Sequence, residues 1–441
     1  MNRILIISEY FAPINSIASI RASKLAKYLK LNNCYIGVIS RKLRANEQID
    51  PILQYDLAYV DEHLVVEESL IARFISRLHR SKNNFTSIKS ANNKPGMFKK
   101  ILSRVFHLLM YDFKIYNNTL FFLIKSYANR AARYVEKLCV NYNVVISSYG
   151  PFSCISLAYM AKCKNPELFW IADFRDPLKI DWTLQKRRSY YSKLKDKVAQ
   201  KANAITGISD ACIEEFNETI MRSKKVIYNG YDKDDINDIK PVINSKFSFT
   251  YTGGLYTGKR DLGVIFKAIN DLFSESKIVI DDIEVNYLGN DSLIFYSQAE
   301  ENNMSDICNI HGKVNREKSL HAQLNSHILL LASWNSFGAT GSITGKFLEY
   351  MMINKPIICT ITGNLPNSQL KQMIETANNG VVWEQANDEL DYPVLKNYIY
   401  EQYQRYKEGL PLSFNPNNDY IEQFNYKNIA ANFINIIEEV K

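Results

Sequence analysis

Several common features are missing from this chain of 441 residues. Its seven cysteines are scattered and form no C-x-x-C pair, which argues against a disulfide framework or a zinc site and fits a reducing cytosol. The six histidines form no H-E-x-x-H or similar pair, so we expect no protein-bound metal. No apolar run reaches the roughly eighteen residues of a transmembrane helix, and the opening run is too short for a signal peptide.

Acidic residues are absent between Leu70 and Tyr111, where nine lysines or arginines occur in a chain of net charge +8. Residues 73–80 and 97–109 combine basic flanks with apolar residues at helical spacing. Such segments suit an anionic membrane surface, and a solvated basic insertion at about 70–110 explains them equally well. No recognition motif accompanies the charge, so we expect no nucleic-acid partner. We expect a cytoplasmic protein, with peripheral attachment to the inner face of the membrane as an option.

Apolar runs of strand length alternate with amphipathic stretches of helix length along the whole chain. Most of these runs are continuous, which indicates strands buried on both faces of a parallel sheet. The expected strands are 4–8, 35–40, 144–148, 168–173, 204–208, 225–228, 247–252, 284–288, 307–311, 328–332, 357–361 and 380–382. The predicted fold class is therefore α/β, with two doubly wound, Rossmann-like domains.

The domain boundary is predicted between residues 228 and 247, where polar, turn-rich and linker-like pieces separate the two halves. We expect an N-terminal domain at 1–228, containing the basic insertion, and a second domain at 247–418. Residues 419–441 have apolar side chains at helical spacing and are predicted to form a terminal helix. Because open α/β sheets bind ligands at the carboxyl ends of their strands, we expect the two domains to face a central cleft.

The most informative stretch is 338–357, a Gly-rich turn followed by a helix between two expected strands. On that helix Ser342, Lys346 and Glu349 share one face. Free backbone N–H groups at the turn, together with the helix dipole, attract an anion. The lysine can neutralise a phosphate, and the carboxylate can accept hydrogen bonds from ribose hydroxyls. The stretch therefore indicates a nucleotide diphosphate site; the alternative is a capped surface helix with a Lys346–Glu349 ion pair.

This stretch resembles the donor site of GT-B glycosyltransferases, in the branch that has a K-x-x-E-Y helix. The wider chain is similar to the retaining, GT4-like group that builds bacterial surface polysaccharides. The resemblance implies that Lys346 faces the diphosphate and Glu349 the ribose. It also implies that helix 419–441 crosses back onto the N-terminal domain. The backbone N–H groups expected to hold the diphosphate belong to Gly341, Ser342, Ile343 and Thr344.

A second Gly-rich loop, with Gly253 and Gly254, follows the expected strand 247–252. These glycines permit close approach of the backbone, and Lys259 can neutralise the leaving diphosphate. The related pattern often has an arginine at position 254, so Lys259 or Arg260 must supply that charge here. The segment around His311 resembles the one whose backbone meets the nucleotide base. The expected catalytic residues are Lys259, Lys346 and Glu349.

Three turns in the first half resemble the acceptor side of the family. The Y-F-A-P turn at 10–13 precedes a helix that carries Arg21, which could reach a phosphate, although residues 13–20 lack the family's glycine pair. Segments 147–153 and 170–176 resemble S-S-x-P-P-x-S and D-F-R-D. They assign Tyr149, Arg175 and Asp176 to the acceptor side. Alternatively, Arg175 belongs to a structural ion-pair network with its neighbouring aspartates.

The resemblance implies a hexosyl- or N-acetylhexosaminyl-transferase that is retaining, metal-independent and without a bound cofactor. Its donor would be a nucleotide sugar, with a UDP-sugar favoured and a GDP-sugar as the alternative. Its acceptor would be a lipid-linked or oligosaccharide glycan of a capsule or lipopolysaccharide O-antigen. Two rival functions are a nucleotide-sugar 2-epimerase or hydrolase of the same fold and a non-catalytic glycan-binding partner. The missing glycine pair favours the second rival, and the retained lysines and Glu349 argue against it.

Overall fold

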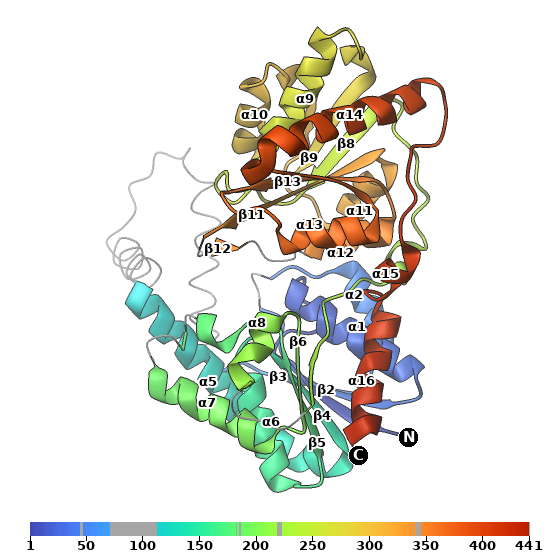
Figure 1. The fold of residues 1–441 in the computed structure, drawn as a ribbon. Helices are drawn as coiled ribbons and strands as arrows, with labels where there is room; N and C mark the ends of the chain where they lie inside the picture. Colours follow the sequence, from blue (N-terminus) through green and yellow to red (C-terminus); the bar gives the residue numbers. More distant parts are fainter. Residues whose placement is uncertain are drawn as a thin grey trace, which may run out of the picture. The chain divides into compact units, whose positions relative to one another are not determined.

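The computed structural model describes residues 1–44, 47–70, 113–181, 183–184, 187–217, 223–337, 339–340 and 345–440. The chain divides into two compact units (Figure 1). Unit 1 comprises Met1–Asn229 and Tyr426–Lys441, and unit 2 comprises Gly230–Asn425. Residues 230–246, which the sequence predicted to separate the two domains, therefore belong to unit 2. The basic insertion predicted at about 70–110 lies outside the described residues, apart from Leu70.

Unit 1 is built on a parallel sheet of seven strands in the order β3-β2-β1-β4-β5-β6-β7. The strands are β1 Arg3–Ile7, β2 Tyr35–Arg41, β3 Glu62–Val66, β4 Val144–Tyr149, β5 Phe169–Phe174, β6 Ala204–Gly207 and β7 Ser223–Val226. Successive side chains of a strand point to opposite faces. In β1, Ile4 and Ile6 accordingly join one hydrophobic cluster and Leu5 and Ile7 the other. A continuous apolar run is thus what a sheet covered on both faces requires.

Helices cover both faces of this sheet. They are α1 Ile17–Leu31, α2 Pro51–Tyr55, α5 Phe113–Leu138, α6 Ser153–Lys164, α7 Arg188–Lys201, α8 Asp210–Ile213 and α16 Tyr426–Val440. Residues of α5, α6 and α7 pack into the cluster on one face, and residues of α1 and α16 into the cluster on the other. Helix α1 begins after Ser16, whose hydroxyl accepts a hydrogen bond from the backbone N–H of Ser19.

The end of the chain differs from the single terminal helix predicted at 419–441. It forms two helices, α15 Asn418–Glu422 in unit 2 and α16 in unit 1. Figure 1 shows α16 alongside α1. The apolar side chains of α16 include Ile429, Phe433 and Ile437, which are all buried. This apolar stripe explains why α16 packs onto the sheet of unit 1.

Unit 2 repeats the same strand order in a second parallel sheet, β10-β9-β8-β11-β13-β14, and a short strand, β12, pairs antiparallel with β11. The strands are β8 Phe247–Thr252, β9 Ile283–Leu288, β10 Cys308–Ile310, β11 Ile328–Ser336, β12 Ala339–Thr340, β13 Ile357–Thr362 and β14 Gly380–Glu384. The remaining helices are α9 Gly263–Ser274, α10 Ser292–Glu300, α11 Arg316–Asn325, α12 Gly345–Ile353, α13 Gln369–Ala377 and α14 Asp388–Lys407.

Each sheet has a topological switch point, where the strand order reverses. It lies between β1 and β4 in unit 1 and between β8 and β11 in unit 2. Doubly wound sheets bind ligands at the carboxyl ends of the strands beside this point. The fold therefore directs attention to the residues that follow β1, β4, β8 and β11.

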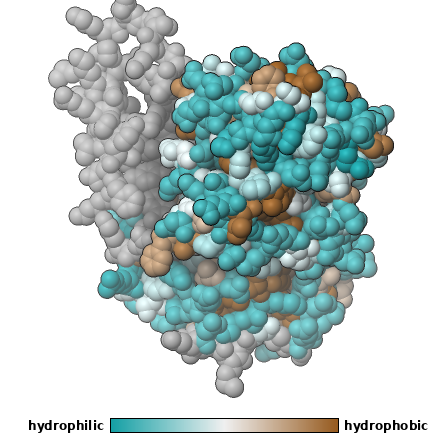
Figure 2. All heavy atoms as spheres, turned by 45° about the horizontal axis from the view of Figure 1, so that its top comes forward, coloured by the Kyte–Doolittle hydropathy of each residue, from teal (hydrophilic) through white to brown (hydrophobic). Residues whose placement is uncertain are grey.

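The surface of the described chain is mainly polar on the face that Figure 2 shows, with apolar side chains in scattered patches. No helix among the described residues is long and apolar enough to cross a membrane.

Candidate functional site

The loop after β8 meets the first turn of α12 at one side chain, Lys346. Gly253 follows β8 with a φ of +107°, and its N–H donates to the Leu288 carbonyl. A Cβ at Gly253 would lie 2.6 Å from Nζ of Lys346, so only glycine leaves room for this lysine. The Lys346 ammonium donates to the Tyr251 hydroxyl at 3.0 Å. The structure thus places two residues predicted for the donor site, Gly253 and Lys346, in contact.

The charge of Lys346 is held in an unfavourable environment. Loss of hydration on burial and, to a smaller extent, the charge of Arg260 lower the pKa of Lys346 to about 7, while Glu349 and Asp291 partly oppose the shift. Among the described residues Lys346 forms no ion pair. An anion bound beside its ammonium would supply the missing counter-charge and raise this pKa.

Arg260 and Lys259 occupy the loop between β8 and α9. Arg260 is buried and donates to the Gly254 carbonyl at 3.2 Å, and its Nε has no hydrogen-bond partner among the described residues. Its guanidinium lies 4.3 Å from the centre of the Tyr256 ring. The exposed Lys259 places Nζ 5.7 Å from the Trp334 ring of β11. The loop therefore carries two cations beside aromatic rings near the switch point of unit 2.

Backbone strain is concentrated in the same loop. Tyr256 and Thr257 have φ values of +51° and +55°, followed by Gly258 at +86°. Non-glycine residues pay roughly 1–3 kcal/mol each for such conformations, which cluster at ligand sites. The strain marks the loop as a candidate ligand-binding element.

The alternative of a capped surface helix requires an ion pair between Lys346 and Glu349, but Glu349 pairs with Arg316 instead. Its Oε1 lies 3.3 Å from Nε of Arg316, and the same guanidinium bonds the buried Asp235 at 2.8 Å. Glu349 is only partly exposed. The arginine holds this carboxylate in place on α12 and leaves it room to accept further hydrogen bonds.

The remaining donor-site predictions are placed only in part. His311 donates its backbone N–H to the Tyr287 carbonyl at 2.9 Å, and its exposed ring lies 3.4 Å from Oδ1 of Asn286. Its backbone N–H is therefore already engaged. Gly341, Ser342, Ile343 and Thr344 lie outside the described residues.

Arg21, which the sequence indicated could reach a phosphate, is engaged by neighbouring groups inside unit 1. Arg21 is 1% exposed and forms a two-armed ion pair with Asp173, with N–O distances of 2.9 and 2.7 Å. Its other donors bond the carbonyls of Ile227 and Tyr228 and the side chain of Asn229. Every N–H of the guanidinium is therefore engaged inside unit 1. The sequence could not show this, because Asp173 is 152 positions away.

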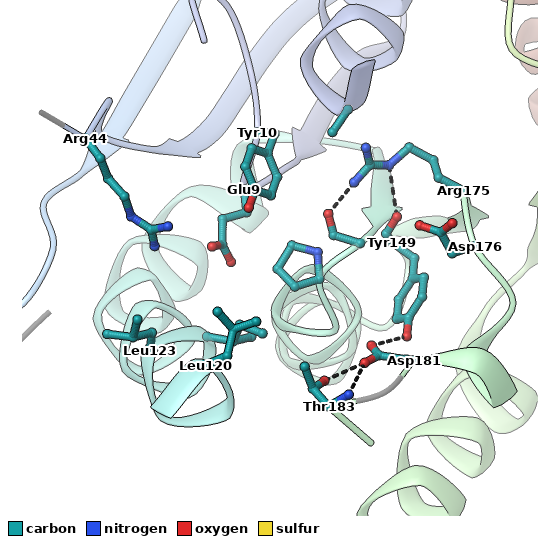
Figure 3. A pocket seen from close by; sticks show the side chains of 14 residues that line it. Glu9, Tyr10, Arg44, Leu120, Leu123, Tyr149, Arg175, Asp176, Asp181 and Thr183 are labelled. Carbon is teal, nitrogen blue, oxygen red and sulfur yellow. Dashed lines mark hydrogen bonds between the residues drawn. The ribbon is translucent and has the colours of Figure 1, made fainter. Parts of the chain in front are cut away.

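The other acceptor-side residues line a cavity of about 410 Å³ at the switch point of unit 1 (Figure 3). Arg175 donates to the carbonyls of Tyr149 and Gly150, not to the aspartates beside it in the sequence. The Tyr149 hydroxyl donates to Asp181 at 2.6 Å. Asp176 also lines the cavity, and partial desolvation raises its pKa while Arg175 opposes the shift.

Sequence reasoning missed several residues of this cavity, and Glu9 is the most deeply buried carboxylate among them. It lies two residues after the end of β1 and is 3% exposed. Burial raises its pKa, and Arg41, Arg44 and Ser153 oppose this shift. The usable signal was its position immediately after the expected strand 4–8, at whose carboxyl end the switch-point rule predicts ligand contacts.

The two sheets and their covering helices have the architecture of the GT-B fold, which confirms the predicted fold class. No protein-family model matches the chain. No curated protein matches its sequence significantly.

Solved structures of similar fold include sucrose-phosphate synthase of Thermosynechococcus elongatus, at a TM-score of 0.60 and 11% identity, with 100% of this chain and 99% of that chain covered. The HepE protein of Anabaena, in complex with UDP and glucose, has a TM-score of 0.55 at 10% identity, with coverage of 99% and 100%. A putative UDP-N-acetylglucosamine 2-epimerase of Listeria monocytogenes has a TM-score of 0.53 at 8% identity, with coverage of 99% and 96%. At these identities the likeness establishes the fold.

Proposed function

We propose that the protein is a GT-B glycosyltransferase that takes a sugar from a nucleotide-sugar donor. The observation that carries this proposal is the position of the Lys346 ammonium beside Gly253, at the carboxyl end of β8. A cation next to a strained, glycine-containing loop at a switch point suits a diphosphate. The lowered pKa of Lys346 supports the same ligand, because an anion would restore the charge that burial disfavours.

In this proposal Lys346 and Lys259 neutralise the diphosphate, and Glu349 accepts hydrogen bonds from the ribose. By resemblance, backbone N–H groups of Gly341–Thr344 contribute to diphosphate binding, and Gly254 and His311 lie at the donor. Fixed cations stabilise the charge that develops on the departing diphosphate, so the reaction would not depend on a metal. Removing one such contact typically costs about 10²–10³ in rate. Retention at the transferred sugar rests on the resemblance alone.

The finer assignments are also proposals. We assign a UDP-sugar as the favoured donor, with a GDP-sugar as the alternative, and a lipid-linked or oligosaccharide acceptor that belongs to a surface glycan. The nine basic residues between Leu70 and Tyr111 support a cytoplasmic enzyme that docks peripherally on anionic lipid. If the full chain does not bind anionic vesicles, and deleting the insertion leaves activity on lipid-linked glycan unchanged, the docking proposal is refuted.

Thermal unfolding in the presence of UDP-, GDP-, CMP- and dTDP-sugars tests the donor site. The variants are Lys346→Ala and Glu349→Ala. The matched control is Lys277→Ala. Lys277 precedes β9, so it lies at the amino ends of the strands, away from the donor site at their carboxyl ends. We expect one nucleotide class to stabilise the wild type and the control, by about 2.7 kcal/mol at a concentration 100 times Kd. The two site variants should lose this stabilisation.

The other outcomes separate the rival functions. If folded protein responds to no nucleotide sugar, the donor site is refuted and the non-catalytic glycan-binding function is favoured. If the protein releases free sugar, or an epimer of the donor, without any acceptor, it is a hydrolase or 2-epimerase. Transfer of labelled sugar to a glycan, dependent on Lys346, would establish the transferase.

A further inference from the structure

The cavity of unit 1 has no role assigned by the donor chemistry. It lies beside the carboxyl ends of β1 and β4, and all of its lining residues belong to unit 1. Its volume of about 410 Å³ falls within the range of about 300–1,000 Å³ that is usual for small-molecule sites. The cavity is therefore large enough to be a binding site in its own right.

The carboxylate of Glu9 is only half satisfied inside this cavity. Its Oε2 accepts a hydrogen bond from the Ser153 hydroxyl at 2.9 Å. Its Oε1 is 3.9 Å from Nε of Arg41, which is beyond hydrogen-bond distance, and the terminal groups of Arg41 pair with Glu47. No donor among the described residues bonds Oε1. This oxygen faces the open cavity, where a ligand hydroxyl can donate a hydrogen bond to it.

The walls of the cavity are of two kinds. Figure 3 shows the Glu9 carboxylate directed into the space between Arg44 on one side and Tyr149 with Asp181 on the other. Helix α5 supplies a wall of aliphatic side chains, namely Leu120, Leu123 and Ile124. A sugar ring matches this combination, because its C–H groups pack on an apolar wall and its hydroxyls reach polar groups at the rim.

The charges of the cavity favour a neutral occupant. Among the described residues that line it, there are three carboxylates, those of Glu9, Asp176 and Asp181, and two guanidinium groups. Arg44 bonds Glu68 through Nε, and Arg175 bonds two backbone carbonyls. A uronic acid or a sugar phosphate would therefore add negative charge to a site that already has an excess of it.

We propose that this cavity holds a neutral sugar unit of the acceptor and that Glu9 binds it by accepting a hydrogen bond from a sugar hydroxyl. This inference rests on the proposed transferase function, whose acceptor class it specifies. A hydrogen bond to a charged group contributes enough that its loss weakens binding about 10- to 100-fold. Burial raises the pKa of Glu9, and the charges of Arg41 and Arg44 oppose this shift.

Saturation-transfer NMR and titration calorimetry on the full chain test the proposal. The probes are the methyl glycosides of glucose, galactose and N-acetylglucosamine, with methyl glucuronide as the charged counterpart. Three variants are compared with the wild type. Glu9→Gln removes the charge, Leu123→Trp fills the cavity without touching Glu9, and Glu167→Gln is the matched control, an exposed residue that precedes β5 at the opposite edge of the sheet.

We expect at least one neutral glycoside to bind the wild type and Glu167→Gln alike, and to bind Glu9→Gln about tenfold more weakly, because the glutamine amide still accepts a hydrogen bond but carries no charge. Leu123→Trp should abolish binding, and it tests the cavity even if Glu9→Gln does not fold. Glucuronide should bind the wild type more weakly than the neutral sugars. The proposal is overturned if no neutral glycoside binds, if both site variants bind normally, or if glucuronide binds best.

Nucleotide-sugar titrations on the same variants separate this inference from the proposed function. Glycoside binding by a protein that binds no nucleotide sugar would refute the transferase and leave a sugar-binding cavity. Normal donor binding without any glycoside binding would refute the cavity alone. If both hold, the Michaelis constant for the acceptor should rise in Glu9→Gln while that for the donor stays unchanged.

Discussion

A methyl group at Gly253 tests whether the nucleotide site depends on where the Lys346 ammonium lies. Gly253 has a φ of +107°, which side chains rarely adopt, and a Cβ there would lie 2.6 Å from Nζ of Lys346. The Gly253→Ala variant therefore has two separable effects. The backbone strain should cost about 1–3 kcal/mol of stability. The flexible end of the lysine should move away from Tyr251 at little further cost in stability, but its charge moves with it.

The displaced cation determines the size of the binding defect. Loss of one hydrogen bond to a charged group costs about 1.5–3 kcal/mol, or roughly 10- to 150-fold in the Kd for UDP. The matched control is Gly409→Ala, also in unit 2, because Gly409 has a φ of +68° and open space where its Cβ would lie. Urea unfolding and calorimetric titration with UDP should show that both variants lose stability, while only Gly253→Ala loses affinity.

Either of two results would refute this reasoning. If Gly253→Ala binds UDP as tightly as the wild type while Lys346→Ala does not, the lysine reaches the diphosphate from another position and Gly253 is only a turn residue. If neither variant changes UDP affinity, the nucleotide site lies elsewhere.

Three further predictions concern the charged residues Lys346, Glu349 and Arg21. Folding lowers the pKa of Lys346 from 10.5 to about 7, so between pH 7 and 10.5 the unfolded chain binds more protons than the folded chain. The free energy of unfolding should therefore rise with pH across this range. Urea unfolding at pH 7 and 9.5 should show that the free energy of unfolding rises less with pH in Lys346→Met than in the wild type. An equal or smaller rise in the wild type would contradict the lowered pKa. In calorimetry, Glu349→Gln should weaken the binding of UDP about tenfold and that of 2′-deoxy-UDP less, because the deoxy ligand already lacks one hydroxyl partner. Equal losses of affinity for the two ligands would exclude contact between Glu349 and that hydroxyl. Arg21→Met should destabilise unit 1 by about 3–5 kcal/mol in urea unfolding, since Asp173 stays buried without its partner, and should leave UDP binding unchanged. Lys30→Met, which removes an exposed pair, should cost less than about 1 kcal/mol, and similar losses in these two variants would contradict the buried ion pair.

The fold class was predictable because each central strand had to be apolar on both faces. In β1 the four residues Ile4 to Ile7 divide evenly between the two hydrophobic clusters. Strand β3, Glu62–Val66, was not predicted. It lies at the edge of its sheet, only Val66 in it is buried, and its apolar run from Leu64 to Val66 is too short to stand out in the sequence.

The donor-site residues came from local motifs that any reader of the sequence can find, namely the glycine pair after β8 and the lysine of α12. Their roles stay predictions. Their contact is a property of the fold, because Gly253 and Lys346 are far apart in the chain and meet only where β8 and α12 converge. The sequence likewise suggested a Lys346–Glu349 pair, whereas Arg316 on α11 takes the carboxylate.

The sequence by itself determined which segments would be buried as strands, and hence two doubly wound units with ligand sites at the carboxyl ends of their strands. Only the tertiary structure decided which charged side chains are available at those ends. Arg21 follows a family motif yet is fully engaged by Asp173 and backbone carbonyls. Glu9 belongs to no motif yet faces a cavity, and one of its carboxylate oxygens accepts no hydrogen bond from the described residues. The physical reason is that burial depends on the local run of side chains, whereas the partner of a charge depends on which distant strands the sheet brings side by side.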